Sequence, residues 1–170
     1  MNEITQIARK ALTITHLIVC LSLCTASVSR ADELPLGHSS PPIMFKVNGL
    51  RSGKGFVAMS VFEKTSAKEF PSNDKKAVRT FYVPLNGKTE VEIPVDSLPP
   101  GEYAVSVMHD EAADHKMHFN LIGIPVEGFG FSNNPTVYFG PPSFKRAQLH
   151  VDESSTTTAV RFEIKMKYYL

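Results

Sequence analysis

The stretch TAVRFEIKMKY, residues 158–168, has the strictest alternation of apolar and charged side chains in the chain. The apolar positions are Val160, Phe162, Ile164 and Met166, and the charged ones are Arg161, Glu163, Lys165 and Lys167. Successive side chains of a β-strand point to opposite faces, so a period of two places one face on a core and the other in water. The stretch therefore predicts a half-buried strand in a protein built from sheets.

Six other runs of this kind lie upstream, with turn residues between them. They are IMFKVNGL (43–50), GKGFVAMSVFEK (53–64), AVRTFYVPL (77–85), KTEVEIPV (88–95), EYAVSVMHD (102–110) and RAQLHV (146–151). The Asn86-Gly87 pair is typical of a tight hairpin between the third and fourth runs. Together the runs predict one all-β domain over residues 43–168, an antiparallel sandwich of about seven strands. The one candidate helix, SAKEFPSND (66–74), would be interrupted by Pro71.

The N-terminal residues 1–31 have the features of a cleavable signal peptide. Arg9 and Lys10 precede the apolar run ALTITHLIVCLSLCTA (11–26), and Ser29-Arg30-Ala31 places small residues before a cleavage site. The run is shorter than the roughly 20 residues that a spanning helix needs. We therefore expect an exported protein, periplasmic or secreted, with no transmembrane segment in the mature chain. DELPLGHSSPP (32–42) would be a flexible linker into the domain.

Removal of this segment changes the cysteine content and the charge of the chain. Cys20 and Cys24 both lie in it, so the mature protein would have no thiol and no disulfide. The 18 Lys and Arg less the three in residues 1–31 leave 15, and the 17 Asp and Glu less Glu3 leave 16. A near-neutral chain without a basic block argues against nucleic acid as a partner.

Three passages together resemble one known family. They are GLRSGKGFVAMSVFE (49–63), SLPPGEYAVSVMHDE (97–111) and LIGIPVEGFGFSNNPTVYFGPPSFKRAQLHV (121–151). In this order and spacing they resemble the bacterial extracytoplasmic family called domain of unknown function 2141. The LPPGEY segment is also similar to transthyretin-like and carboxypeptidase-regulatory-like sandwiches. The resemblance implies an immunoglobulin-like or prealbumin-like sandwich and no particular activity, because the family has no assigned biochemical role.

The segment MHDEAADHKMHFN (108–120) concentrates candidate metal ligands. In the family this segment resembles a calcium loop, and Asp110 and Asp114 match its first and fifth positions. Ala112 and His115 depart from that pattern, and two carboxylates do not supply the six to eight oxygens that calcium takes. The imidazoles suit a transition metal better. The candidate ligands are His109, Asp110, Asp114, His115 and His118.

A simpler interpretation of this segment remains open beside the metal site. His109 and Asp110 would brace the end of a strand by hydrogen bonds, and the remaining residues would form a solvated turn. This second interpretation requires no cofactor.

The segment GIPVEGFGFSNNPTVYFGPPSF (123–144) predicts a long aromatic and glycine-rich loop. Connections of this length in compact domains are usually functional or disordered, and so many aromatic rings argue against disorder. In one interpretation Phe129, Phe131, Phe139 and Phe144 plug the open end of the sandwich. In the other, an exposed surface binds a saccharide, a peptide or a protein. Its residues would be Phe129, Phe131, Asn133, Asn134 and Tyr138.

Catalytic signatures are missing from the sequence. It has no G-x-S-x-G elbow, no H-E-x-x-H pair and no phosphate-binding glycine loop, and the predicted mature chain has no cysteine nucleophile. We expect an exported, non-enzymatic binding or interaction module whose partner is an envelope protein, a peptide or a saccharide. The alternatives are a periplasmic metal-binding protein and an accessory structural module that pairs through its edge strands.

Overall fold

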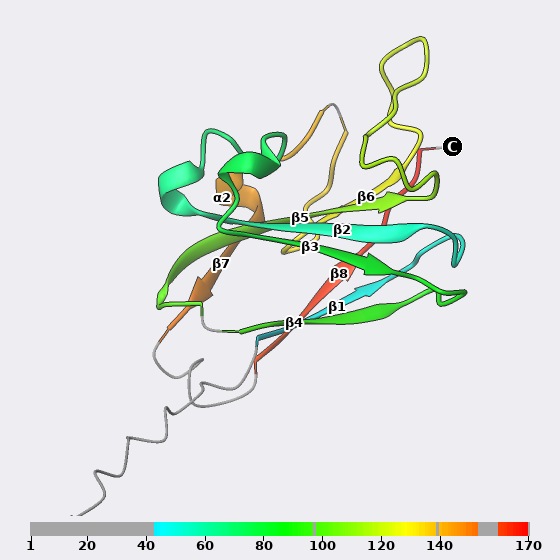
Figure 1. The fold of residues 1–170 in the computed structure, drawn as a ribbon. Helices are drawn as coiled ribbons and strands as arrows, with labels where there is room; N and C mark the ends of the chain where they lie inside the picture. The colour runs from blue at the N-terminus through cyan, green and yellow to red at the C-terminus, as the bar shows by residue number, and fades with distance from the viewer. Residues whose placement is uncertain (1–42, 97, 139, 153–159, 170) are drawn as a thin grey trace, which may run out of the picture. The chain divides into compact units, whose positions relative to one another are not determined.

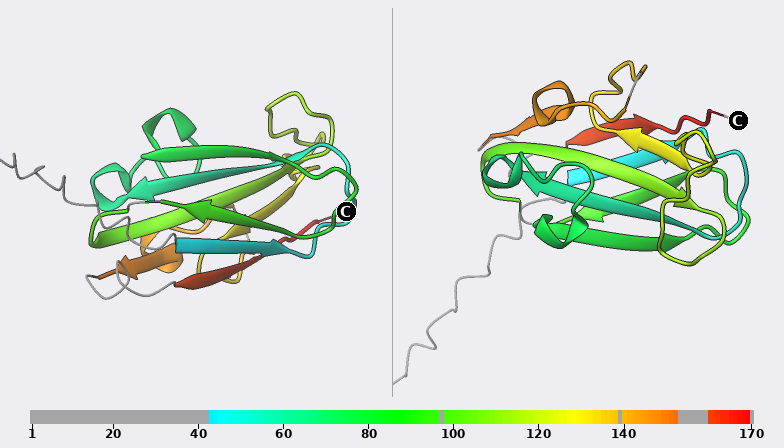
Figure 2. Two further views of the ribbon diagram at one scale, coloured as in Figure 1. Left: turned by 60° about the horizontal axis from the view of Figure 1, so that its bottom comes forward. Right: turned by 90° about the horizontal axis from the view of Figure 1, so that it is seen from above.

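Two β-sheets packed face to face form the protein in this computed structural model, which describes residues 43–96, 98–138, 140–152 and 160–169 (Figures 1 and 2). The smaller sheet has the strand order β4-β1-β8, and the larger has the order β3-β2-β5-β6, with β7 also pairing with β5. The strands are β1 (Ile43–Asn48), β2 (Phe56–Glu63), β3 (Arg79–Pro84), β4 (Val91–Val95), β5 (Gly101–Asp110), β6 (Gly128–Phe131), β7 (Gln148–Val151) and β8 (Arg161–Lys165). The predicted all-β class is confirmed. The predicted signal peptide, the linker and Phe139 lie outside the described residues.

The core lies between the sheets and follows the predicted alternation. Phe45 and Val47 of β1, with Ile93 of β4, are at most 1% exposed. From β8, Ile164 is fully buried and Phe162 stacks on Phe45 with ring centroids 5.4 Å apart. Each strand of the smaller sheet thus buries one face and leaves its charged residues in water.

Strand pairing, direction and number differ from the sequence prediction in three places. The hairpin expected at Asn86-Gly87 does not form, because β3 pairs with β2 in the larger sheet and β4 pairs with β1 in the smaller one. β8 pairs with β1 in parallel, from Met44 opposite Arg161 to Asn48 opposite Lys165, so the sandwich is not wholly antiparallel. Alternation defines the buried face of a strand but not the direction of its neighbour, and β7, which precedes β8, belongs to the other sheet. In addition, residues 128–131 of the predicted aromatic loop form β6, which pairs with β5.

The remaining described elements are short. The candidate helix at 66–74 is replaced by two 3-10 turns, η1 (Lys64–Ser66) and η2 (Asp74–Lys76), and α2 (Phe144–Ala147) precedes β7. In both views of Figure 2 these 3-10 turns and the loop between β5 and β6 lie at opposite ends of the sandwich. No helix in the described ranges is long and apolar enough to cross a membrane.

One buried hydroxyl connects three strands of the larger sheet. Ser132, which directly follows β6, is 1% exposed, and its Oγ accepts the Val105 N–H of β5 at 2.8 Å. The same Oγ donates to the carbonyl of Ala147, directly before β7. Removal of this hydroxyl would leave a buried backbone N–H without its acceptor.

We expect Ser132→Ala to lower the free energy of unfolding by about 1–3 kcal/mol, the cost of an unsatisfied buried polar group. Urea denaturation followed by circular dichroism measures this value. The matched control is Ser106→Ala on β5, whose side chain faces the outside of the sheet and which should change stability by less than about 0.5 kcal/mol. Equal effects of the two substitutions would contradict the structural role of Ser132.

Candidate functional site

A groove crosses the outer face of the larger sheet, the face that points away from the core. Met59 and Val61 of β2 pack in the core, so Ala58 and Ser60 point outward and line the groove. Because these two side chains are small, they leave space above the sheet. The groove has a volume of about 970 Å³, at the upper end of the usual range for small-molecule sites. Its floor is formed by Ala58, Ser60, Thr80, Tyr82, Ser106, Met108, Phe129 and Phe131.

Loops raise the walls of this groove above the sheet. One wall comes from the segment between β5 and β6, another from the residues after β6, and a third from residues 71–74 at the start of η2. Tyr169, which follows β8, completes the lining. The wall residues are Pro71, Ser72, Asp74, His115, Met117, Phe119, Ile122, Gly123, Ile124, Pro125, Val137, Tyr138, Gly140, Pro141 and Tyr169. Asp74 is the one carboxylate among these described lining residues, and neither lysine nor arginine is among them. The groove is therefore suited to a ligand without charge.

His115, Phe56 and Tyr82 form an aromatic cluster, and two of its rings, His115 and Tyr82, line the groove. The His115 ring lies 4.6 Å from the ring of Phe56 and 4.8 Å from that of Tyr82, measured between centroids. His115 has a φ of 63°, so its backbone adopts the left-handed conformation. This turn directs the imidazole onto the sheet, where it packs as an aromatic ring.

The Gly-Phe alternation of β6 decides which rings reach the groove. A Cβ on Gly128 would overlap the Tyr168 ring, and a Cβ on Gly130 would lie 2.8 Å from Cγ2 of Ile164. Both glycines therefore face the smaller sheet at close approach, and Phe129 and Phe131 face outward. Their backbone is held to β5, with Phe129 opposite Met108 and Phe131 opposite Ser106.

The predicted aromatic surface is exposed only in part. Phe129 and Phe131 are 6% and 8% exposed, whereas Tyr138 is 75% exposed. Phe131 and Phe144 each contact Phe70 edge-on, at 6.0 and 5.9 Å between centroids. This cluster lies on the outside of the larger sheet, so these rings do not plug the open end between the sheets. The reason is that the glycines, and not the phenylalanines, point inward from β6.

Asn133 and Asn134 use their amides within the fold. Asn133 Nδ2 donates to the carbonyl of Gln148 at 3.0 Å, and Asn134 Nδ2 donates to the carbonyl of Glu163 at 2.8 Å. Asn134 Oδ1 in turn accepts the N–H of Lys165. Both asparagines have positive φ, which this residue type tolerates in turns. They connect the end of β6 to β7 and β8 and do not face the groove as ligand-binding groups.

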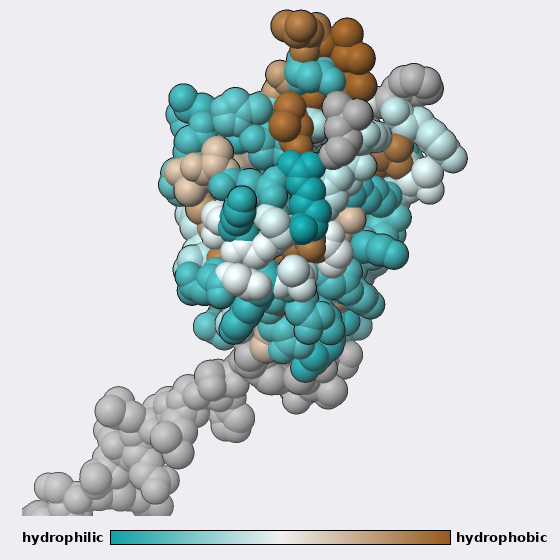
Figure 3. All heavy atoms as spheres, turned by 90° about the vertical axis from the view of Figure 1, so that its right-hand side faces the viewer, coloured by the Kyte–Doolittle hydropathy of each residue, from teal (hydrophilic) through white to brown (hydrophobic). Residues whose placement is uncertain are grey.

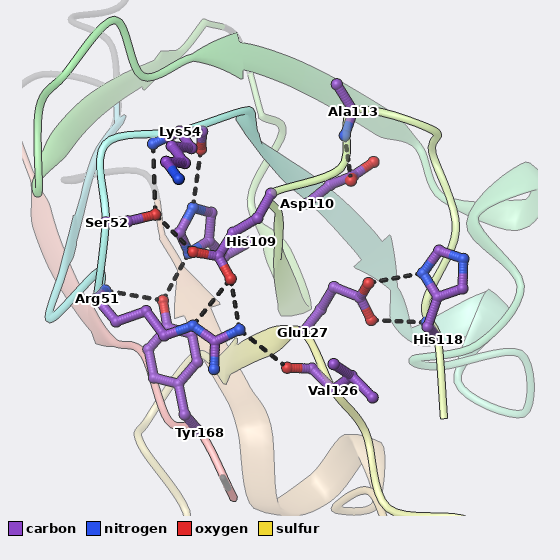
Figure 4. A network of polar contacts seen from close by, with 11 residues as sticks. Arg51, Ser52, Lys54, His109, Asp110, Ala113, His118, Val126, Glu127 and Tyr168 are labelled. Atoms are coloured by element: carbon purple, nitrogen blue, oxygen red, sulfur yellow. Dashed lines mark hydrogen bonds and ion pairs between the residues drawn. The ribbon is translucent and has the colours of Figure 1, made fainter. Parts of the chain in front are cut away.

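His109 is buried in a network at the end of β5. It is 0% exposed, and its Nε2 lies 3.0 Å from the carbonyl oxygen of Lys54. A carbonyl can only accept, so Nε2 carries a hydrogen, and Nδ1 accepts the hydroxyl of Tyr168 at 2.7 Å. Burial raises the pKa of Tyr168, so the hydroxyl keeps its proton. Figure 4 shows the ring between these two partners, turned away from His118.

Arg51 and Glu111 extend this network. Glu111 belongs to the 108–120 segment that the sequence singled out, whereas no motif indicated Arg51. Arg51 donates through Nε and Nη2 to Oε2 of Glu111, at 2.8 and 2.5 Å, and its guanidinium lies 4.7 Å from the centroid of the Tyr168 ring. Ser52 Oγ donates to the other carboxylate oxygen. The hydrogen bond from Arg51 is the largest cause that lowers the pKa of Glu111. Three segments of the chain, 51–54, 109–111 and the one with Tyr168, are thereby held together at one end of the sandwich.

Asp110 and Asp114 organise the turn that follows β5. Asp110 is fully buried, and its two carboxylate oxygens accept the N–H groups of Ala113 at 2.7 Å and His115 at 2.6 Å. Asp114 Oδ1 accepts the N–H of Lys116. Carboxylates that cap backbone N–H groups in this way shape the turn. The arrangement agrees with the interpretation in which Asp110 braces the strand end.

His118 is held between two carboxylates. Its Nδ1 lies 2.6 Å from Oε1 of Glu127, and its Nε2 lies 3.1 Å from Oδ2 of Asp114. Glu127 Oε2 also accepts the backbone N–H of His118 at 2.6 Å (Figure 4). The hydrogen bond with Glu127 is the largest cause that raises the pKa of His118, and the charge of Asp114 adds to it. Sequence spacing did not indicate Glu127, which lies nine positions beyond His118 and next to β6.

The five predicted metal ligands are thus divided among separate clusters. His109 faces Tyr168, His115 packs on Phe56, and His118 bonds to Glu127. Within the described ranges, no three or more His, Cys, Asp and Glu side chains are grouped as metal ligands. Of the predicted ligands, the structure brings Asp114 and His118 together, and the five do not converge because the three imidazoles contact different partners.

The His118 contacts predict a pH-dependent stability. A raised folded-state pKa means that the protonated ring stabilises the fold below its usual pKa of about 6.5, and that this contribution is lost as the pH rises through the raised value. We expect the urea midpoint of the native protein to fall between about pH 6 and about pH 9, and His118→Gln to lack this component. His150→Gln on β7 serves as the control and should keep the pH dependence of the native chain. Parallel pH profiles of the native protein and His118→Gln would contradict the assignment.

Comparison of the chain with known proteins identifies its family but assigns no activity to it. No curated protein and no solved structure matches the chain. The family described as an uncharacterized protein conserved in bacteria, DUF2141, matches residues 45–159. This range begins within β1, contains β2 to β7, and includes the groove floor and the loop between β5 and β6. The chain therefore belongs to the bacterial DUF2141 family.

Proposed function

We propose that this protein is an exported, non-enzymatic binding module that holds an uncharged, largely apolar molecule in the groove over its larger sheet. The observation that carries the proposal is the groove itself, with its volume of about 970 Å³ over a floor that combines small side chains with the rings of Tyr82, Phe129 and Phe131. A site of this kind, concave and mostly apolar with a few polar groups, is typical of small-molecule binding.

The polar groups on the floor support an apolar ligand over a saccharide. Saccharides are usually held by several side chains free to donate and accept hydrogen bonds. Here Ser60 Oγ and Thr80 Oγ1 lie 3.3 Å apart and bond to each other. The amides of Asn133 and Asn134 are already paired with backbone carbonyls. The aliphatic and aromatic walls are left as the main source of affinity.

The lining also supports binding over catalysis. Nucleophilic catalysis by a hydroxyl needs a base positioned beside it. Among the described lining residues, His115 is the one imidazole, and its ring packs on Phe56 and Tyr82. The proposed export rests on the signal-peptide features of residues 1–31, and the two-sheet core supports an immunoglobulin-like or prealbumin-like sandwich.

A substitution that fills the groove tests the proposal. We expect the uncharged fluorescent probe N-phenyl-1-naphthylamine to bind the native protein, and Ser106→Phe to weaken that binding about tenfold or more, because the added ring occupies the floor. Met44→Phe places the same ring on the smaller sheet, opposite Pro94 in β4 and away from the groove, and should bind the probe as the native protein does. Fluorescence titration measures the Kd, and thermal denaturation confirms that both variants fold.

Two results would count against the proposal. One is an absence of probe binding by the folded native protein. The other is an unchanged Kd in Ser106→Phe, which would place the probe elsewhere on the molecule.

A further inference from the structure

The loop between β5 and β6 contains a small hairpin, residues 118–126, that projects from the end of the sandwich (Figure 1). Phe119 and Pro125 form an antiparallel bridge across it. The Asn120 N–H donates to the carbonyl of Ile124 at 2.9 Å, and the Val126 N–H donates to the carbonyl of His118 at 3.0 Å. The base is fixed to the domain by the contacts between His118 and Glu127. The hairpin is thus a defined, anchored element.

The apex of this hairpin is apolar and fully exposed. Leu121 is 106% exposed and Ile122 is 78% exposed, and Phe119 beside them is 59% exposed. Figure 3 shows apolar side chains gathered at this projecting end of the molecule. The segment FNLIGIPV (119–126) has no charged residue. Neighbouring large apolar side chains in water mark a surface that is covered by something else.

Three backbone N–H groups of the apex are paired within the hairpin. Asn120 Oδ1 accepts the N–H groups of Ile122 at 3.1 Å and Ile124 at 2.9 Å. The carbonyl of Asn120 accepts the N–H of Gly123 at 3.0 Å. Gly123 has a φ of 78°, which allows the chain to reverse. These internal hydrogen bonds lower the cost of moving the N–H groups of Ile122, Gly123 and Ile124 out of water.

Two exposed tyrosine side chains share the groove lining with the hairpin. Tyr138 is 75% exposed and Tyr169 is 41% exposed, and both line the groove together with Ile122. Tyrosine rings favour the boundary between lipid headgroups and hydrocarbon, and aliphatic side chains favour the hydrocarbon itself. We infer that Leu121 and Ile122 insert into the surface of a lipid bilayer, with the tyrosines at the headgroup level. A protein pocket as occupant has less support, because an uncharged apex offers it no ion pair for recognition.

The chain contains no tryptophan, so a single introduced tryptophan reports its own surroundings. The test uses the full chain with Leu121→Trp and vesicles of phosphatidylcholine, whose uncharged surface removes electrostatic attraction. We expect the emission to shift to the blue on addition of vesicles and to be quenched by phosphatidylcholine brominated on its acyl chains. The control is Lys68→Trp, an exposed position between the two 3-10 turns, where emission should stay that of a tryptophan in water.

Position-specific quenching is needed because the apolar N-terminal segment can itself attach the full chain to vesicles. Attachment by that segment alone would leave both tryptophans unquenched. As a second variant, Ile122→Asp in the Leu121→Trp chain should weaken vesicle affinity, read from the tryptophan at 121, about tenfold or more, since it places a charge where the apex meets hydrocarbon.

The outcomes separate this inference from its alternatives. Emission from position 121 that ignores vesicles overturns it. A blue shift without lipid that grows with protein concentration also overturns it, because a second copy of the chain would then cover the apex. The inference does not depend on the proposed ligand. Ser106→Phe combined with Leu121→Trp should keep full vesicle binding, so failure of the groove proposal and failure of this one give different results.

Discussion

The close approach of the C-terminal segment to β6 is the contact on which the rest of the structure depends. Gly128 and Gly130 carry no side chain into the space between the sheets, and Tyr168 and Ile164 occupy that space. A side chain at either glycine would force the sheets apart, because protein interiors have no spare volume for an added carbon. The two phenylalanines that alternate with these glycines are consequently directed outward, where they form part of the groove floor.

The same approach organises the end of the sandwich. Once Tyr168 lies against Gly128, its hydroxyl reaches His109, and its ring lies under the guanidinium of Arg51. The buried histidine is thus explained by hydrogen bonds that it could not lose without exposing unpaired polar groups to an apolar core. The base of the 118–126 hairpin adjoins this network, since Arg51 Nη2 also donates to the carbonyl of Val126. A rigid support of this kind lets a short hairpin project without tertiary contacts at its apex.

The groove and the hairpin are physically joined, and this connects the two proposals. Phe119, Ile122 and Pro125 line the groove on one side of the hairpin, while Leu121 and most of Ile122 remain in water. A molecule that left a bilayer beside the apex would meet the groove wall without crossing an open stretch of water. Transfer of an apolar molecule between a bilayer and a protein is favoured by such continuity, because hydration of apolar surface is the main cost of the passage.

The sequence by itself determined the fold class and the strands, because a two-residue period of burial is a local property that each segment carries on its own. All seven predicted runs contain a strand, but Asn86-Gly87 forms a turn from one sheet to the other and not the expected hairpin. The interpretation in which Asp110 braces the end of a strand could also be made from the sequence, and its hydrogen bonds to the following turn agree with it. Only the tertiary structure decided that β8 runs parallel to β1, that GFGF is a strand, and that the histidines of the 108–120 segment go to three different partners. Those outcomes depend on tertiary contacts between segments that are distant in the sequence, such as Tyr168 with His109 and Glu127 with His118. The spacing of residues along the chain does not predict such contacts.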